Sequence, residues 1–512
     1  MKRVFQRTPV LFQQIWWAFQ RIGLSAVMCC PLVAAAEVPP PSKAHLRSEL
    51  EREQAQRLKD IQAAKQGVQQ LAAPQLLPAS PATQDQQCFP IRHIRFSGHT
   101  VLSREQLLDS IHFKPACLGL SQINTYLRLI TNRYVAAGYV TSRAFLVPQD
   151  LTTGELKILI LEGKLEGLRF NGKPQGFLNN AFPHLVGKIL NLRDIEQGLD
   201  QINRLSRYNA QIKLLPGTKT GFSIVDIRTK TGRWNNASFG FNNSGQKSTG
   251  GEAQLAYTLG AENIFDALDQ WSLSGSRSSA WRTHEDSESL SLNVDIPRGA
   301  WNVAYRTTYS SYKNAFLSNN MTFYTAGQTN SHDLTVKWLF HRDAISKSSL
   351  TGGVSHRREK NYLGDNLLTT SSRQLSSAFL SFDYSSQLGQ GFFTLSPRFT
   401  LGTDWFGGES DRGKSAGAPQ AQFYKGTLTT SYTYPVNQAL SLTSTVFGQW
   451  SNDKLYGSQQ ALGENILSGA SKRSRFPGMK AITGAMTSPI NWDSCLIWVI
   501  CRFNGRWIPA AL

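Results

Sequence analysis

The sequence has few acidic residues, and beyond its first forty positions it has no long hydrophobic run. Only 17% of its 512 residues are charged, and 35 Asp+Glu stand against 54 Lys+Arg. The mean hydropathy is −0.30, and the lack of any run of about 18 apolar residues excludes a bundle of transmembrane helices. A hydrophobic content of 40% excludes a wholly disordered chain. A transmembrane β-barrel stays open, because its strands give only weak hydropathy patterns.

Motifs of enzymes and metal sites are also missing. The chain contains no HExxH, GxSxG, P-loop or CxxC pattern, and its nine histidines are scattered. We therefore predict no enzyme, no catalytic residue, no cofactor and no metal site. The formal charge of +19 fits nucleic acid, anionic lipid or a basic channel equally well, so charge alone does not choose a partner.

The N-terminus predicts export from the cytoplasm. Basic residues open the chain, a short apolar stretch follows, and Ala34-Ala35-Ala36 supplies the small residues of a cleavage site. We expect residues 1–36 to be a signal peptide. Export makes oxidation the default for the two cysteines of the next folded segment, so we predict a disulfide between Cys88 and Cys117.

A single helix and a linker come after the signal peptide. Residues 42–71 carry a narrow apolar stripe near helical spacing on an otherwise polar surface. Such a helix is either simply solvated or docked in a wet cavity. Residues 72–87 contain three prolines and no periodicity, which indicates an extended linker that tethers the helix.

Residues 88–232 contain an internal repeat. IRFSG at 94–98 returns as LRFNG at 168–172, and the segment 145–160 returns as 212–227. Both copies predict the order β-α-α-β-β. We therefore predict two small α+β modules, at 88–165 and 166–232, with a structural or binding role.

From residue 234 the chain alternates apolar and polar residues with a period of two. In SLSLNVDI the leucines, Val294 and Ile296 share one face, and serines, Asn293 and Asp295 share the other. Eleven such strands are predicted up to Trp450. A soluble sandwich or propeller would also alternate, but long strands rich in Tyr and Trp near their ends favour an outer-membrane barrel with a wet lumen.

Links between these strands alternate between long polar segments and short turns. Long links include GGESDRGKSAGAPQ and NYLGDNLLTTSSR, and short ones include IPRGA and LGQG. Extracellular loops and periplasmic turns differ in this way. Because the modules enter the first strand from the short-turn side, we place them in the periplasm. The positive charge then belongs mainly to wet surfaces, and we expect no nucleic-acid partner.

Several strings resemble one family. CFPIRHIRFSGHTVLS, ITNRYVAAGYVTSRAFLVPQDL and LILEGKLEG are similar to the outer-membrane transporters of two-partner secretion, the haemolysin secretion/activation group ShlB/FhaC/HecB. The resemblance covers roughly residues 42–470. It implies periplasmic POTRA modules, a sixteen-strand antiparallel barrel and an N-terminal helix that plugs the pore. It also implies capture of an unfolded haemolysin or adhesin by strand addition, and ATP-free export.

The implied partners are this secreted exoprotein, outer-membrane lipid and the barrel assembly machinery that inserts the protein. Other functions remain open at this stage. A barrel insertase would also combine POTRA modules with a barrel, whereas a passive porin would have no modules.

The C-terminal part departs from the family pattern. Residues 234–470 predict an incomplete barrel and 471–512 a non-family tail, in which Arg475 and Phe476 are the only remnant of the family's pore loop. Eleven strands cannot close a barrel entered and left on one side. We hypothesise a frameshift near residues 470–477. The product would then be inactive, or would act at most as a periplasmic binding module.

Overall fold

The computed structural model describes residues 76–78, 88–242, 253–278, 285–318, 320–415, 417–436, 441–456, 459, 496–503 and 506–508. The expected signal peptide, the helix at 42–71, and Arg475 and Phe476 lie outside these residues. All described residues belong to one compact unit. Within the described part of the chain, no helix combines the length and apolar content that a membrane span requires.

Module 1 is a three-stranded sheet with two helices and a small ribbon. Its sheet has the order β2-β5-β4, and a separate ribbon joins β1 to β3. The elements are β1 (Cys88–Ile91), β2 (His93–Ser97), α3 (Arg104–Ile111), β3 (Ala116–Gly119), α4 (Leu120–Ala136), β4 (Arg143–Leu146), the 3-10 turn η1 (Leu151–Thr153) and β5 (Glu155–Leu161).

Local sequence explains where the helices of module 1 begin and end. Ser103 and Gln106 form a reciprocal capping box at the start of α3. Gly138 follows α4 with a φ of +95°, a conformation that ends helices and suits glycine. The helices bury Leu107, Ile123 and Ile130 against the apolar face of β5.

Module 2 repeats this plan. Its sheet has the order β6-β8-β7. In both modules the first sheet strand pairs parallel with the last, which pairs antiparallel with the strand before it. The elements are β6 (Lys164–Phe170), α5 (Leu178–Ala181), α6 (Leu192–Asn203), β7 (Gln211–Pro216) and β8 (Phe222–Arg228). The predicted β-α-α-β-β repeat is therefore present in both copies.

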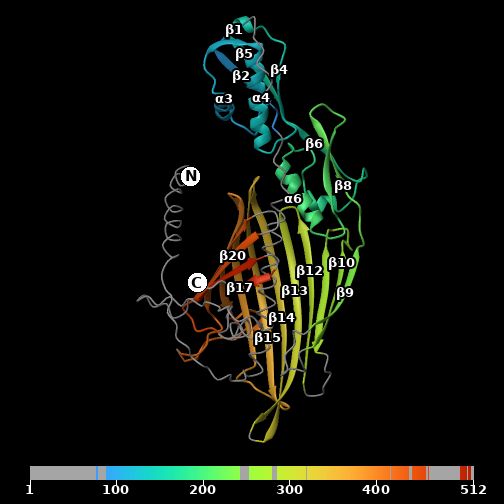
Figure 1. Ribbon diagram of the computed structural model, residues 1–512, viewed down its shortest axis with the longest axis vertical. Helices are drawn as coiled ribbons and strands as arrows, with labels where there is room; N and C mark the ends of the chain where they lie inside the picture. The colour runs from blue at the N-terminus through green and yellow to red at the C-terminus, as the bar shows by residue number, and fades with distance from the viewer. Residues whose placement is uncertain are drawn as a thin grey trace. The chain divides into compact units, whose positions relative to one another are not determined.

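The rest of the described chain forms one large antiparallel sheet (Figure 1). From β9 to β20 each long strand pairs with the next along the chain, and β9 and β22 stand at the two ends of the order within the described residues. The eleven long strands are β9 (Asn235–Asn242), β10 (Gln254–Glu262), β11 (Gln270–Ser278), β12 (Asp286–Arg298), β13 (Trp301–Ser318), β14 (Met321–Arg342), β15 (Ser346–Leu363), β17 (Arg373–Leu388), β18 (Gly391–Thr403), β19 (Tyr424–Pro435) and β20 (Ser441–Ser451). The short β16 (Asn366–Leu367) pairs only with β15.

The eleven long strands match the number predicted from alternation. Beyond them, the structure has strands where the sequence pattern predicted none. β21 (Leu496–Phe503) pairs antiparallel with β20, and β22 (Arg506–Ile508) pairs with β21. The first six residues of β21 are apolar without alternation, so the period-two criterion did not detect the strand.

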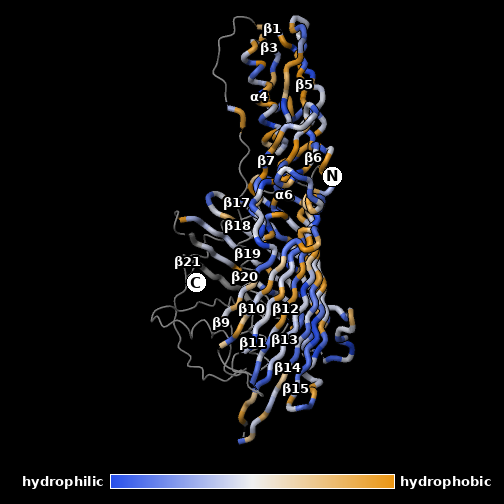
Figure 2. Tube along the Cα trace, turned by 90° about the vertical axis from the view of Figure 1, so that its right-hand side faces the viewer, coloured by the Kyte–Doolittle hydropathy of each residue, from blue (hydrophilic) through white to orange (hydrophobic). Residues whose placement is uncertain are grey.

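Alternation gives the sheet two different faces. On β14 the even positions from Leu334 to Phe340 are exposed, while Thr335 and Leu339 between them are partly buried. Their register partners on β13 and β15, such as Tyr305 and Val354, are also apolar. We call this exposed band the apolar belt. In Figure 2 the strands are more hydrophobic toward module 2 and more hydrophilic away from it.

The structure joins the sulfurs of Cys88 and Cys117 in a disulfide across β1 and β3. The two cysteines lie 29 residues apart in the sequence, and the bridge closes the loop between them. Closing a loop of this size restricts the unfolded chain and stabilises a small domain by about 2–4 kcal/mol. The bridge therefore fastens the start of module 1 to the strand that precedes α4.

We predict that the double variant Cys88→Ser/Cys117→Ser loses about 2–4 kcal/mol of stability in module 1. Hydrogen exchange of the full-length protein should show faster exchange in β1, β3 and α3 but unchanged exchange in the barrel strands. Reduction of the wild-type protein should have the same effect. Unchanged protection in module 1 would show that the ribbon holds without its bridge.

Candidate functional site

The candidate site consists of the open edges of the two module sheets and the joint that links module 2 to the barrel. An edge strand presents backbone N–H and C=O groups that can pair with another extended chain. In module 1 the edges are β2 and β4, and in module 2 they are β6 and β7. The two edges of each sheet differ in character.

In module 1 the β4 edge is apolar and the β2 edge is charged. Phe145 on β4 is 46% exposed, and its register partner Leu159 on β5 is also exposed. Together they form an apolar pair on the sheet face that does not carry the helices. On β2, Arg95 forms an ion pair with Glu155 at 3.3 Å. Charge on an edge disfavours strand addition, so β4 is the edge available to an apolar segment.

In module 2 one edge is covered and the other is open. The Leu165 N–H on β6 donates to the Lys188 carbonyl at 2.9 Å, and the Gly187 N–H donates to the Leu165 carbonyl at 2.7 Å. The loop around residue 188 therefore occupies the β6 edge. On β7, Leu214 is 40% exposed, and no second strand pairs with β7 among the described residues.

An extended segment of the linker binds beside the β4 edge. The Leu77 N–H donates to Asn132 Oδ1 at 2.8 Å, and Asn132 Nδ2 donates to the Leu77 carbonyl at 3.2 Å. The adjacent Thr131 accepts a hydrogen bond from the Ala144 N–H of β4 at 3.1 Å. Helix α4 therefore presents side chains that pair with backbone amides on this side of the module.

A buried carboxylate stabilises the body of module 1. Glu162, just after β5, accepts hydrogen bonds from the N–H groups of Thr100 and Val101 at 2.7 and 3.0 Å, from the Thr100 hydroxyl and from the Tyr134 hydroxyl at 2.9 Å. Burial alone raises its pKa, but these donors outweigh burial and lower the pKa below its ordinary value. Burial, together with the hydrogen bond to Glu162, raises the pKa of Tyr134.

Helix α6 attaches module 2 to the short turns of the barrel. Gln197 and Gln201 both donate to the Gly299 carbonyl in the β12–β13 turn, at 3.3 and 3.0 Å. Gln201 also donates to Asn302 Oδ1 at 2.8 Å. The module therefore meets the short-turn end of the sheet, as the alternating loop lengths predicted.

Ion pairs complete the joint between α6 and the barrel. Asp200 accepts from Arg342 at 2.8 Å and from Lys347 at 2.7 Å, at the β14–β15 turn. Arg204 pairs with Asp295 of β12 at 2.5 Å. The side chain of Arg342 is only 5% exposed. Buried charges of this kind need their partners, because an unpaired one is costly to keep away from water.

A further carboxylate clamps the chain after α6. Glu262 at the end of β10 is 3% exposed. It accepts hydrogen bonds from the backbone N–H groups of Ser206 and Arg207 at 3.0 and 2.9 Å, and from the Ser206 hydroxyl at 2.9 Å. Module 2 is therefore attached at β10, β12, β13 and the β14–β15 turn.

The inward face of the sheet is polar and charged. Most positions that alternate with the apolar belt carry hydroxyl, amide or charged groups, with Leu339 as an exception. Arg306 stands opposite Asp333 in the β13–β14 register, and Arg357 pairs with Glu359 on β15. A wall of this composition suits passage of a hydrated polypeptide.

The sequence-predicted site residues fall in two groups. Cys88 and Cys117 form the disulfide of module 1, and Arg475 and Phe476 lie outside the described residues. Sequence reasoning missed Glu162, Asn132, Glu262 and the polar face of α6. Of these, Asn132 and Glu162 lie within strings used for the family resemblance. Among the described residues, no cluster of His, Cys, Asp or Glu has the arrangement of a metal site.

Comparison with known families and proteins gives a consistent result. Residues 221–465 match the family described as haemolysin secretion/activation protein ShlB/FhaC/HecB. Residues 89–163 match the ShlB-type POTRA domain, and residues 164–216 match another POTRA domain family.

Two curated relatives illustrate the similarity. The chain is 40% identical over 374 residues to the outer membrane transporter CdiB of Dickeya dadantii, covering 73% of this chain and 67% of that protein. It is 31% identical over 397 residues to the hemolysin transporter protein ShlB of Serratia marcescens, covering 76% and 70%.

Solved structures agree with this assignment. CdiB from Escherichia coli superposes with a TM-score of 0.79 at 31% identity and covers 92% of this chain and 84% of that one. CdiB from Acinetobacter baumannii superposes with a TM-score of 0.60 at 20% identity, covering 83% and 80%, which shows a shared fold. The predicted fold class, periplasmic POTRA modules followed by an antiparallel barrel sheet, is confirmed.

We predict that Glu162→Gln loosens module 1 by about 1–3 kcal/mol, because the variant loses charge-assisted hydrogen bonds. The same interaction makes the wild-type module sensitive to acid. Since the folded state lowers this pKa, the stabilisation is fully present above the ordinary value of 4.5. It is lost as the pH falls through the lower, folded value.

Hydrogen exchange of α4 at neutral pH and at pH values below 4.5 measures both effects. The wild type should lose protection on acidification, and the variant should change less. Equal acid sensitivity in the two proteins would assign the effect to another group.

We predict that Asp200 and Arg342 are energetically coupled. A double-mutant cycle with Asp200→Asn, Arg342→Gln and their combination should give a coupling energy of about 0.5–3 kcal/mol for opening of the joint. The measurement is hydrogen exchange of α6 in the full-length protein. Lys173→Gln, which changes an exposed lysine of the same module, is the control. Additive effects of the two variants would show that the pair does not hold the joint.

Proposed function

The chain belongs to the haemolysin secretion/activation family ShlB/FhaC/HecB, and from this membership we propose that it transports a secreted exoprotein across the outer membrane by two-partner secretion. Its POTRA modules lie in the periplasm and its strands lie in the outer membrane. The cargo is an unfolded exoprotein of the haemolysin or adhesin class. Relatives of this chain are transporters rather than enzymes.

The observation that carries the proposal is the pair of open, apolar edge strands, β4 and β7. Among the described residues no further strand pairs with either one, and each carries an exposed apolar side chain, Phe145 on β4 and Leu214 on β7. An unfolded chain has the matching features, because its backbone amides are free and its apolar side chains are not yet buried. Strand addition pairs the backbones and places alternate side chains on the edge.

The linker contact supports recognition of extended chains on this side of module 1. Asn132 pairs with both backbone groups of Leu77, a mode of binding that requires no particular side chain. Backbone recognition of this kind suits a long cargo that must slide. A site that demanded one side chain would hold the cargo in one place.

The joint at α6 sets where captured cargo is delivered. Module 2 is fixed to the turns at the short-loop end of the barrel by Gln201, Asp200 and Arg204. A segment released from β7 is therefore released near the mouth of the polar inner wall. We propose that folding of the exoprotein outside the cell, rather than ATP, draws the remaining chain through.

We predict that Phe145→Asp and Leu214→Asp each lower affinity for the exoprotein about five-fold. A charge on the edge removes cross-strand apolar contacts worth about 1 kcal/mol. Secretion of the cognate exoprotein into the medium and binding of its unfolded N-terminal part to purified protein measure the effect.

Matched controls place the same charge on exposed apolar residues away from the open edges. Leu120 lies at the start of α4, and Val186 lies in the loop that covers β6. Leu120→Asp and Val186→Asp should bind and secrete as the wild type does. Equal losses in the edge variants and the controls would contradict capture by strand addition.

A further inference from the structure

The outward face of the barrel changes abruptly from apolar to basic at one level. On β14 the outward positions run from Phe340 to Leu334 and then continue with His332. His332 stands opposite His356 on β15, and His356 stands opposite Ser376 on β17. The apolar belt therefore ends along a line across three neighbouring strands. This line lies on the side away from module 2, which is the extracellular side.

Cations continue outward beyond this line. Arg358 and Lys360 follow His356 at successive outward positions of β15, about 7 Å apart along the strand. Their register partners are neutral: Asn330 and Gln374 for Arg358, and Gln328 for Lys360. The acidic neighbour on the same strand, Glu359, points to the inner face and pairs with Arg357. Arg358 and Lys360 form a basic patch on the outward face. No acidic residue faces this patch from β14 or β17.

An aromatic turn folds over the same patch. Helical turn η3 (Trp405–Gly407) is tied to β17 because Ser376 Oγ donates to the Trp405 carbonyl at 2.6 Å and Gln374 Nε2 donates to the Phe406 carbonyl at 3.0 Å. The rings of His356 and Phe406 lie 6.1 Å apart, edge to face. Glu409, just beyond η3, pairs with Lys414.

The turn η3 holds two aromatic side chains in the open. Trp405 is 50% exposed and Phe406 is 66% exposed. Phe406 adopts a φ of +56°, which bulky residues rarely do. Exposed aromatic side chains next to cations are typical of the boundary between hydrocarbon and headgroups.

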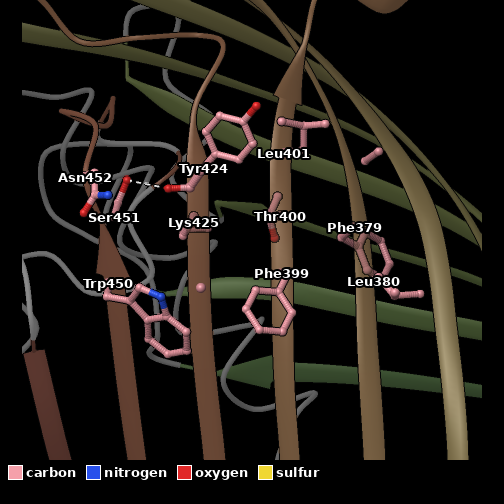
Figure 3. A pocket seen from close by; sticks show the side chains of 12 residues that line it. Phe379, Leu380, Phe399, Thr400, Leu401, Tyr424, Lys425, Trp450, Ser451 and Asn452 are labelled. Atoms are coloured by element: carbon pink, nitrogen blue, oxygen red, sulfur yellow. Dashed lines mark hydrogen bonds between the residues drawn. The ribbon is translucent and has the colours of Figure 1, made fainter.

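An apolar groove begins where the patch ends. It has a volume of about 440 Å³ and lies on the outward face of β17 to β20. Figure 3 shows Leu401, Phe399, Tyr424 and Trp450 around it. The ring of Trp450 lies over Gly426, where any side chain would collide with it, and reaches Phe399 edge to face at 6.2 Å. Ala378, which lines the groove, is two residues from Ser376 on β17.

We propose that this surface binds one phosphorylated lipid of the outer leaflet, with its phosphate on Arg358 and Lys360 and an acyl chain in the groove at Leu401. The occupant must be amphipathic, because cations and an apolar groove adjoin at the level where the belt ends. A soluble anion would use only the cations, and an apolar protein segment would use only the groove. The inference rests on the outer-membrane location and not on the identity of the cargo.

Native mass spectrometry of the purified full-length protein tests the site, with bisphosphorylated lipid A as the probe. The wild type should retain this lipid and should retain its dephosphorylated form at least about ten-fold less well. Added inorganic phosphate should not displace the bound lipid. Equal retention of both lipid forms, or displacement by phosphate alone, would overturn the proposal.

Variants test whether lipid retention depends on the patch itself or on a general attraction of the lipid to positive charge. R358Q/K360Q should lose at least about ten-fold in lipid retention. K313Q is the matched control, because Lys313 is an outward cation on β13 that faces Asp286 in the register. Its retention should equal that of the wild type, and an equal loss in K313Q would contradict a specific site.

A second variant keeps the test decisive if the double variant fails to insert. F406G removes one exposed ring, and glycine suits the positive φ at this position. The variant should therefore fold and migrate like the wild type on an unboiled gel, yet retain the lipid several-fold less well. Wild-type retention in F406G and in R358Q/K360Q would show that the patch does not bind lipid.

Discussion

A backbone group inside hydrocarbon has no water to bond with, so each strand of the barrel must pair with its neighbours along its whole membrane-facing length. This constraint fixes the antiparallel ladder from β9 to β20. The ladder in turn fixes the direction of every side chain, because alternate residues of a paired strand point to opposite faces. The apolar belt, the polar inner wall and the basic line at His332 all follow from one register. A shift by one residue would exchange the two faces.

The modules are under a different constraint, because water surrounds them and can bond with their free backbone groups. An edge strand such as β7 can satisfy its outer backbone groups with water, and so it can stay open until another chain replaces the water. Module 2 must nevertheless keep its place at the barrel. Its joint therefore uses charges that are nearly buried, such as Arg342 with Asp200. Such pairs hold position and direction better than they add stability, since desolvation offsets much of their attraction.

The sequence predicts those features that depend on neighbours along the chain. Alternation in SLSLNVDI identified β12, and the repeat of IRFSG as LRFNG identified two modules. Contacts between distant positions were not predictable in this way. Glu162 meets Thr100 only after β5 packs beside β2, and Asn132 meets Leu77 only after the linker turns back. The polar face of α6 looks like an ordinary solvated face, and nothing local shows that Gln201 and Asp200 meet the barrel turns. At residues 496–503 the strand criterion failed because Leu496 to Cys501 are apolar without alternation.

The contrast between the two kinds of sheet suggests why transport runs in one direction. In the proposed mechanism, a cargo segment on β4 or β7 exchanges hydrogen bonds with water for hydrogen bonds with the edge, so its binding is weak and reversible. Along the inner wall, charged groups such as Arg357 and Glu359 pair with each other, and a moving chain finds few open partners. The cargo therefore meets no deep energy minimum between the module edges and the outside. Only folding beyond the barrel buries its apolar side chains for good, and this burial makes the last step hard to reverse.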